Sequence, residues 1–267
     1  MIRVMKFQNG IRNMGVFPIF LAAFIGILLG LLGAGGSTIT IPVFVYILDY
    51  DMKSAIAMSL FVVGSTSLIG SLRYYREQSV VFSHAFTFGI FTALGTIIGA
   101  EISQWISNST QLLLFGVVLL FSSLSMYKNI SFQLAFSFHK KKQFAFESLL
   151  GIFIGIITGM VGIGGGFLLV PSLVLLFQLN MKKAVGTSLL IIFFNTIAGF
   201  LVYSHITTID WKIVGLFSVF SIAGMILSTF LIRFISDRAL KKTFSIIVFL
   251  IGIFILFHHH YQLSPLK

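Results

Sequence analysis

The sequence predicts an all-α fold: a polytopic transmembrane helical bundle of two homologous halves, which we expect to be inverted repeats. Composition is the first observation, because 57% of the 267 residues are hydrophobic, 9% are charged, and the mean hydropathy is +1.05. A soluble domain of this size needs far more charge to cover its surface. The other two observations are long apolar runs and a glycine-rich cluster that occurs twice.

The apolar runs are long enough, or nearly so, to cross a bilayer as helices. They cover 54–72, 82–100, 111–127, 183–204, 211–232 and 243–257. About 20 helical residues, at 1.5 Å each, span a hydrocarbon core of roughly 30 Å. Lys and Arg in cytoplasmic loops then explain the net charge of +11, so no nucleic-acid partner is expected. The absence of cysteine excludes disulfides, thiolate metal sites and cysteine nucleophiles.

The glycine-rich cluster defines the repeat. "GLLGAGGSTITIP" covers Gly30–Pro42, and "GMVGIGGGFLLVP" covers Gly159–Pro171, which lies 129 residues later. Hydrophobic bias alone does not align glycines and a proline in this way. We therefore predict a first transmembrane repeat over 16–128, a cytoplasmic linker over 129–146 and a second transmembrane repeat over 147–258.

Each half opens with two apolar pieces that flank its cluster: 16–32 and 37–48, then 147–161 and 167–179. The second piece of each pair is too short to span a bilayer comfortably. If each pair turns back as a hairpin, the halves are inverted and the basic residues divide 12 to 6 between the two sides. If each pair crosses once, the halves are parallel and the division is 11 to 7. We expect inversion, because broken helices that meet at the midplane are a common transporter plan.

The hairpin arrangement also predicts the side of the membrane on which each loop lies. Loops 73–81, 128–146, 180–183 and 233–242 are expected to be cytoplasmic, and both termini and loop 205–212 are expected to face outward. The basic loops decide this assignment, because Lys and Arg are retained on the cytoplasmic side. The parallel arrangement stays open at this point.

The glycine clusters are candidate binding elements. In hydrocarbon every backbone N–H and C=O needs a partner, so a non-helical tip has to be buried in protein or line a polar cavity. The helix that follows begins with N–H groups that have no intrahelical acceptor, which suits an oxyanion. The predicted walls of the site are Gly33, Gly35, Gly36 and Ser37 on one side and Gly162, Gly164, Gly165 and Gly166 on the other. The alternative is that these glycines only allow close helix packing.

The helix after each cluster repeats the polar theme. Ser59 corresponds to Ser188, and Thr66 corresponds to Asn195. The two positions are seven residues apart, so they lie on one helical face and are added to the substrate-binding candidates. Ser and Thr can also bond to the preceding turn of their own helix, an alternative that is less open to Asn195.

Other functional classes find little support in the sequence. All seven acidic residues, Glu147 among them, lie at segment edges, so no carboxylate pair is placed for acid–base chemistry or for cation coordination. We expect no catalytic residues, no metal and no cofactor, and the chain is not expected to be an enzyme. Arg73 with Tyr74 and Tyr75 is interpreted as an interfacial anchor.

The two copies of G-x-x-G-x-G-G-x-x-x-x-x-P, each followed by M-K-x-A-x-x-x-S-L, resemble the TauE/SafE family of bacterial membrane transporters. The resemblance covers nearly the whole chain, and it implies a multi-pass protein of the inner (plasma) membrane. It also implies a permease or exporter for small sulfur-containing anions such as sulfite or organosulfonates. Ser37 stands where the second copy has Gly166, so a symmetric site is not assumed.

Residues and resemblance together predict a secondary transporter for a small anion. The partners expected are that anion, with a sulfur oxyanion or sulfonate group, and the lipid bilayer; a homo-oligomer stays open. An anion-selective channel is the alternative, because a channel also uses helix N-termini. An embedded enzyme would need a nucleophile with a base or a metal cluster, and the sequence offers neither.

Overall fold

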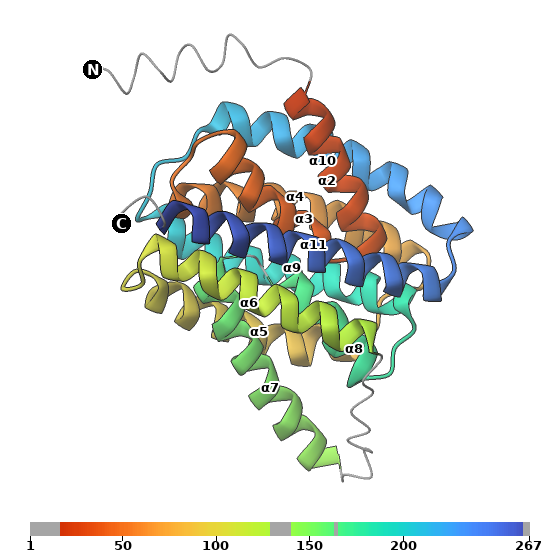
Figure 1. Ribbon diagram of the computed structural model, residues 1–267. Coiled ribbons are helices and arrows are strands. Elements are labelled where there is room, and N and C mark those ends of the chain that lie inside the picture. The colour runs from red at the N-terminus through yellow and green to blue at the C-terminus, as the bar shows by residue number, and fades with distance from the viewer. Residues whose placement is uncertain (1–16, 129–139, 163–164, 264–267) are drawn as a thin grey trace.

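The protein is described here from a computed structural model, which describes residues 17–128, 140–162 and 165–263 (Figure 1). Within these ranges every regular element is helical. The elements are α2 (Phe17–Leu32), α3 (Gly35–Pro42), the π-helical turn η1 (Val43–Ile47), α4 (Met52–Arg76), α5 (Phe82–Ser103), α6 (Asn108–Tyr127), α7 (Lys140–Val161), α8 (Gly166–Leu175), α9 (Met181–Ser204), α10 (Trp211–Leu231), the 3-10 turn η2 (Ile232–Phe234) and α11 (Asp237–Leu263).

The prediction of an all-α bundle of membrane-spanning helices is confirmed. Seven helices in the described part of the chain are long and apolar enough to cross a membrane. Both glycine clusters interrupt helices where expected, since α2 ends at Leu32 and α7 ends at Val161. α7 begins at Lys140, so the last residues of the expected linker are helical. The protein is therefore a multi-pass membrane protein.

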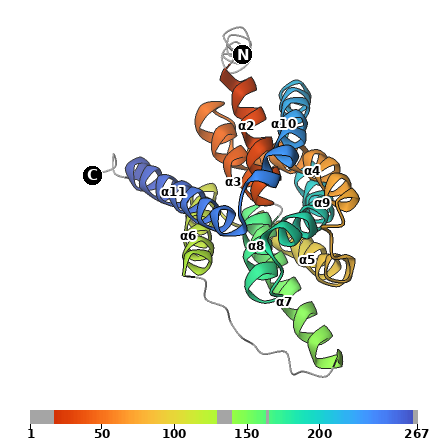
Figure 2. The same cartoon turned by 90° about the vertical axis from the view of Figure 1, so that its right-hand side faces the viewer.

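Helices from the two halves interlock. α2 packs along α10, and α5 packs along α7, so each half places its first helix against the third long helix of the other (Figure 2). Glycines allow this close approach. A methyl group at Gly26 would overlap the carbonyl oxygen of Ser221, and one at Gly155 would overlap that of Thr92. The tightest helix contacts in the protein therefore join one half to the other.

One pair of corresponding helices, α4 and α9, packs in opposite directions. Along the contact between α4 and α9, Gly64 faces Thr196 and Gly70 faces Leu189. Near the end of α4, the Tyr74 side chain faces Gly186. Residue numbers rise along α4 as they fall along α9, so the two helices are antiparallel. The inverted orientation of the two whole halves stays a prediction.

α3 turns back beside α2 and does not continue across the bundle. The α2 helix runs in the same direction as α10, with Gly26 beside Ser221 and Gly30 beside Ser228. The chain then returns, because the Phe44 ring in η1 packs 4.9 Å from the Phe217 ring. The hairpin form of the first pair thus follows from its contacts.

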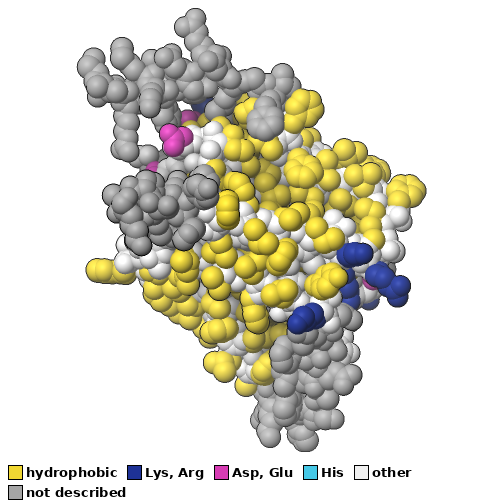
Figure 3. All heavy atoms as spheres, viewed as in Figure 1, with side chains coloured by type: hydrophobic (Ala, Val, Ile, Leu, Met, Phe, Trp, Pro, Cys, Tyr) yellow, Lys and Arg dark blue, Asp and Glu magenta, His cyan; other side chains and the backbone are white. Residues whose placement is uncertain are grey.

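Three of the loops predicted to share one side meet at one end of the bundle. The Glu77 carboxylate after α4 pairs with Lys182 Nζ at 3.2 Å and with the Arg233 guanidinium at 2.9 Å. Figure 3 shows Lys and Arg side chains gathered at the right-hand end of a broad apolar face. The apolar face suits contact with lipid. Which side of the membrane carries the basic end stays a prediction.

One interpretation made from the sequence is wrong. Tyr74 is not an interfacial anchor: it is 1% exposed, and its hydroxyl donates to the Gly30 carbonyl at 2.7 Å. Glu147 lies near the start of its apolar segment, as expected, but it is buried. It accepts a hydrogen bond from Thr87 of α5 at 3.2 Å and lies 3.8 Å from His84 Nδ1. Periodicity within a single helix could not reveal either contact.

Candidate substrate-binding site where the two glycine clusters meet

α2 and α7 both end on a glycine in the left-handed conformation. Gly33 has φ of 68° and Gly162 has φ of 78°, values that other residues rarely adopt. The last carbonyls of each helix lack intrahelical donors, and a buried tyrosine supplies one in each half. Tyr74 donates to Gly30 O, and Tyr203 donates to Gly159 O at 3.1 Å. A hydrogen bond from α4 thus holds the end of α2, and one from α9 holds the end of α7.

The two clusters are in contact. A Cβ placed on Gly166 would lie 2.8 Å from Ala34 Cα and 3.0 Å from Gly33 O. The start of α8 therefore lies against the break between α2 and α3. Among the predicted site residues, Gly33 and Gly166 come together directly, and Ser188 Oγ joins them through a 3.1 Å hydrogen bond to Gly33 O.

Gly165 in the second cluster has polar neighbours. Gly165 caps the N-terminus of α8 with φ of 90°. A Cβ at this position would lie 3.3 Å from Thr158 Oγ1 and 3.4 Å from Asn195 Nδ2. Asn195 is fully buried, and its Oδ1 accepts a hydrogen bond from Thr92 Oγ1 at 3.0 Å. Within the described part of the chain its Nδ2 has no hydrogen-bond partner. The N-terminus of α8 thus faces an amide group that can donate a hydrogen bond and has no acceptor among the described residues.

The described glycines of the first cluster differ in their surroundings. A Cβ on Gly36 would lie 3.0 Å from the Leu29 side chain, whereas one on Gly33 would lie 2.6 Å from Ser188 Oγ. Thr66, another predicted site residue, donates its hydroxyl at 2.7 Å to Val62 O in its own helix. Ser59 is buried, and its hydroxyl has no partner among the described residues. The apolar neighbour of Gly36 thus contrasts with the polar neighbours of the corresponding Gly165.

The structure does not describe the surroundings of three predicted site residues. Gly35 and Ser37 lie in α3, and their surroundings are not described. Gly164 lies outside the described residues. Their assignment to the site stays a prediction.

Sequence reasoning missed four residues that build this region: Thr92, Thr158, Tyr74 and Tyr203. A signal for the tyrosines was present, because Gly30–Tyr74 and Gly159–Tyr203 have the same separation of 44 residues. For Thr92 and Thr158 no signal existed, since a threonine in an apolar helix ordinarily bonds to its own backbone.

The electrostatics of the region come from dipoles. The side chains nearest to the described glycines of the two clusters are uncharged, and no group of His, Asp or Glu in the described part of the chain is arranged to hold a metal. Positive potential comes instead from the first N–H groups of α8. Such a site can bind a small anion through neutral donors.

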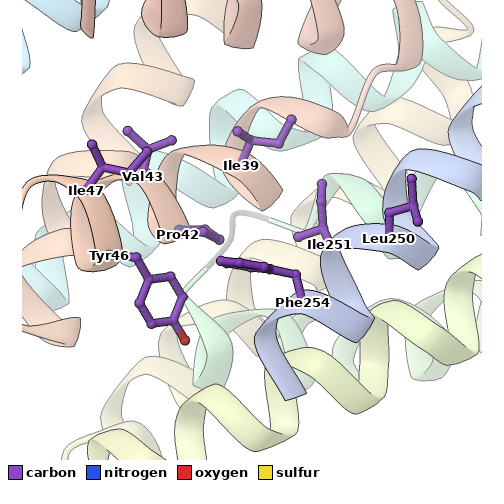
Figure 4. Close-up of a pocket in the computed structure, with 8 residues that line it drawn as sticks. All are labelled: Ile39, Pro42, Val43, Tyr46, Ile47, Leu250, Ile251 and Phe254. Atoms are coloured by element: carbon purple, nitrogen blue, oxygen red, sulfur yellow. The ribbon is translucent and has the colours of Figure 1, made fainter. Parts of the chain in front are cut away.

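A cavity lies away from the two clusters (Figure 4). Residues of α3 and η1 line one side of it, and residues of α11 line the other. Its volume is about 350 Å³. The lining residues are Ile39, Pro42, Val43, Tyr46, Ile47, Leu250, Ile251 and Phe254. Apart from the Tyr46 hydroxyl, these side chains offer only apolar surface. The cavity therefore does not fit a small anion, and it is not the candidate site.

Comparison with known proteins agrees with the repeated motif. The profile of the family described as "Sulfite exporter TauE/SafE" matches residues 19–255. A "Probable membrane transporter protein" of Xylella fastidiosa (strain 9a5c) is 30% identical over 87% of this chain and 91% of that protein. "Probable membrane transporter protein YunE" of Bacillus subtilis (strain 168) is 27% identical over 73% of this chain and 80% of its own length. No solved structure matches. This chain is a membrane transporter that belongs to the sulfite exporter TauE/SafE family.

Proposed function

We propose that the protein is a secondary transporter for a small anion with a sulfur oxyanion group, such as sulfite or an organosulfonate. The proposed site is the meeting point of the two glycine clusters. One observation carries the proposal: the buried Asn195 Nδ2 has no partner among the described residues, and it faces Gly165 at the N-terminus of α8. A buried donor left unpaired costs about 1–3 kcal/mol, and a bound oxyanion removes that cost.

The chemistry of the site favours a weakly held, dehydrated anion. Neutral donors and a helix N-terminus replace part of the hydration shell without a permanent counter-charge. A fixed Lys or Arg would bind the anion more tightly and slow its release. Glycine allows the anion to approach the backbone closely. The sulfur oxyanion class comes from the family, since an N–H donor by itself does not distinguish sulfur from other oxyanions.

We include the inverted orientation of the halves in this proposal, because it makes the two tips interchangeable in alternating access. Single cysteines placed at Lys140 and at Lys182 in the naturally cysteine-free chain should both react with an impermeant maleimide from the cytoplasmic side of the membrane. These two positions flank α7 and α8, which together form the second Gly-split pair. Labelling of the two positions from opposite sides contradicts the hairpin arrangement and supports the parallel one.

Purified protein in proteoliposomes tests the function itself. Radiolabelled sulfite should enter with saturable kinetics, and unlabelled sulfite inside the vesicles should accelerate its entry by exchange. Asn195→Leu should raise the KM with little loss of folded protein. Currents that do not saturate, without exchange, would support the anion-selective channel instead. Protein-free vesicles and denatured protein provide the background.

A further inference from the structure

We propose that Thr92 is the positioning residue that decides which end of the Asn195 amide faces the candidate site. This inference rests on the proposed function of that site. Thr92 is fully buried on α5, and its Oγ1 donates to Asn195 Oδ1 at 3.0 Å. The hydrogen bond turns Nδ2 away from α5 and toward Gly165, where a Cβ would lie 3.4 Å from it.

The direction of the amide matters because its two ends have opposite chemistry. Nδ2 donates hydrogen bonds, and Oδ1 accepts them. With Nδ2 toward Gly165, the polar groups around the start of α8 act as donors and attract an anion. With the amide reversed, Oδ1 would face the same anion with a partial negative charge. One hydroxyl on α5 therefore controls whether Asn195 attracts or repels the substrate.

The Thr92 hydroxyl has a single proton and two acceptors within reach. Its Oγ1 also lies 2.9 Å from Gly89 O, one turn earlier in α5. Gly89 O is already the acceptor of a helical backbone hydrogen bond. Asn195 Oδ1 has no other partner among the contacts that the structure gives. Because leaving a buried acceptor unpaired is costly, the proton is better used on Asn195.

The chain offers a matched control. Thr96 lies one turn along α5, is 1% exposed, and donates only to Thr92 O at 2.8 Å. Thr96→Val removes the same atoms from the same helix without touching Asn195. A general loss of hydroxyls from α5 should thus affect both variants equally, and loss of positioning should affect only Thr92→Val.

The test compares sulfite transport by wild type, Thr92→Val, Thr92→Ser, Thr96→Val and Asn195→Leu in proteoliposomes. Thr92→Val should raise the KM for sulfite about ten-fold with a nearly unchanged maximal rate. Without the hydrogen bond from Thr92, the Asn195 amide is no longer held with Nδ2 toward the anion. Thr92→Ser should restore the wild-type KM, and Thr96→Val should match wild type. If Thr92→Val does not fold, Thr92→Ala replaces it in the same comparison.

Other outcomes overturn the inference in distinguishable ways. If Asn195→Leu raises the KM while Thr92→Val does not, the positioning role is wrong and the proposed site stands. If the wild type transports sulfite and neither variant differs from it in KM, the proposed site is wrong. If sulfite, thiosulfate, sulfoacetate and sulfate are neither transported by wild type nor raise its unfolding temperature, the proposed function fails together with the positioning role.

Discussion

The two glycine clusters share a sequence pattern but differ in what surrounds them. Gly36 in the first half faces Leu29, whereas the corresponding Gly165 in the second half faces Thr158 and Asn195. α8 is buried along its whole length, and α3 ends in a π-helical turn beside the apolar cavity. The repeated motif thus keeps the backbone break, while the side chains beside this pair of corresponding glycines differ.

In the proposed site, the donors to a small anion come from the side of Gly165, where Asn195 Nδ2 lies, and Gly36 offers apolar surface. Substitutions in each half test this division, and those with the strongest predicted consequence come first.

Gly166→Val should abolish transport. A Cβ at this position would lie 2.8 Å from Ala34 Cα, and a backbone atom cannot move aside as a flexible side chain can. Overpacking of this kind costs about 1–3 kcal/mol of stability and separates the two clusters. Sulfite flux and thermal unfolding in detergent measure both effects. Gly215→Val is the control, because nothing lies within 4 Å of a Cβ at that position; equal flux in both variants contradicts contact between the clusters.

Asn195→Leu should weaken anion binding by about 1–3 kcal/mol, because a buried donor to the anion is lost. The corresponding Thr66→Val should change the affinity by no more than about two-fold, since the Thr66 hydroxyl is already bonded to its own helix. Calorimetric titration of sulfite into detergent-purified protein compares the two. Equal losses would show that the first half contributes donors as well.

Tyr74→Phe should lower the free energy of unfolding by about 1–3 kcal/mol, because the Gly30 carbonyl loses its buried donor. Tyr203→Phe should cost less. Gln111 Nε2 donates to Met160 O at 2.6 Å and continues to cover the end of α7 without the tyrosine hydroxyl. Thermal unfolding of the two variants checks the order, and a reversed order would contradict this account of the tips.

Glu77→Gln should have the smallest effect, below about 1 kcal/mol, because Lys182 and Arg233 are partly exposed. Desolvation raises the pKa of Glu77, but the hydrogen bonds and charges of Arg233 and Lys182 outweigh it, so the pKa lies below its ordinary value. The ionised carboxylate therefore stabilises the folded protein when the pH is above the ordinary pKa of a glutamate. This contribution is lost as the pH falls through the lowered pKa of Glu77. Unfolding temperatures measured from neutral to acidic pH should converge for Glu77→Gln and wild type.

The membrane class, the repeated glycine motif and the positions of the helix breaks were predictable from the residues. These properties are local, because lipid requires a helix wherever the chain is apolar and permits a break only where the tip is protected. Gly33, Gly162 and Asn195 were identifiable for that reason: two are duplicated breakers, and the third is an amide in an apolar helix. The all-α bundle and the family also followed from these local signals.

Tertiary structure alone decided which side chains surround each break. Thr92 reaches Asn195 across 103 residues, and Ser188 reaches Gly33 across 155 residues. The same packing turned Tyr74 inward. No spacing within a helix encodes such contacts, because they depend on how α5, α7 and α9 pack once their glycines let the backbones approach. The difference between the apolar neighbour of Gly36 and the polar neighbours of Gly165 is a property of that packing.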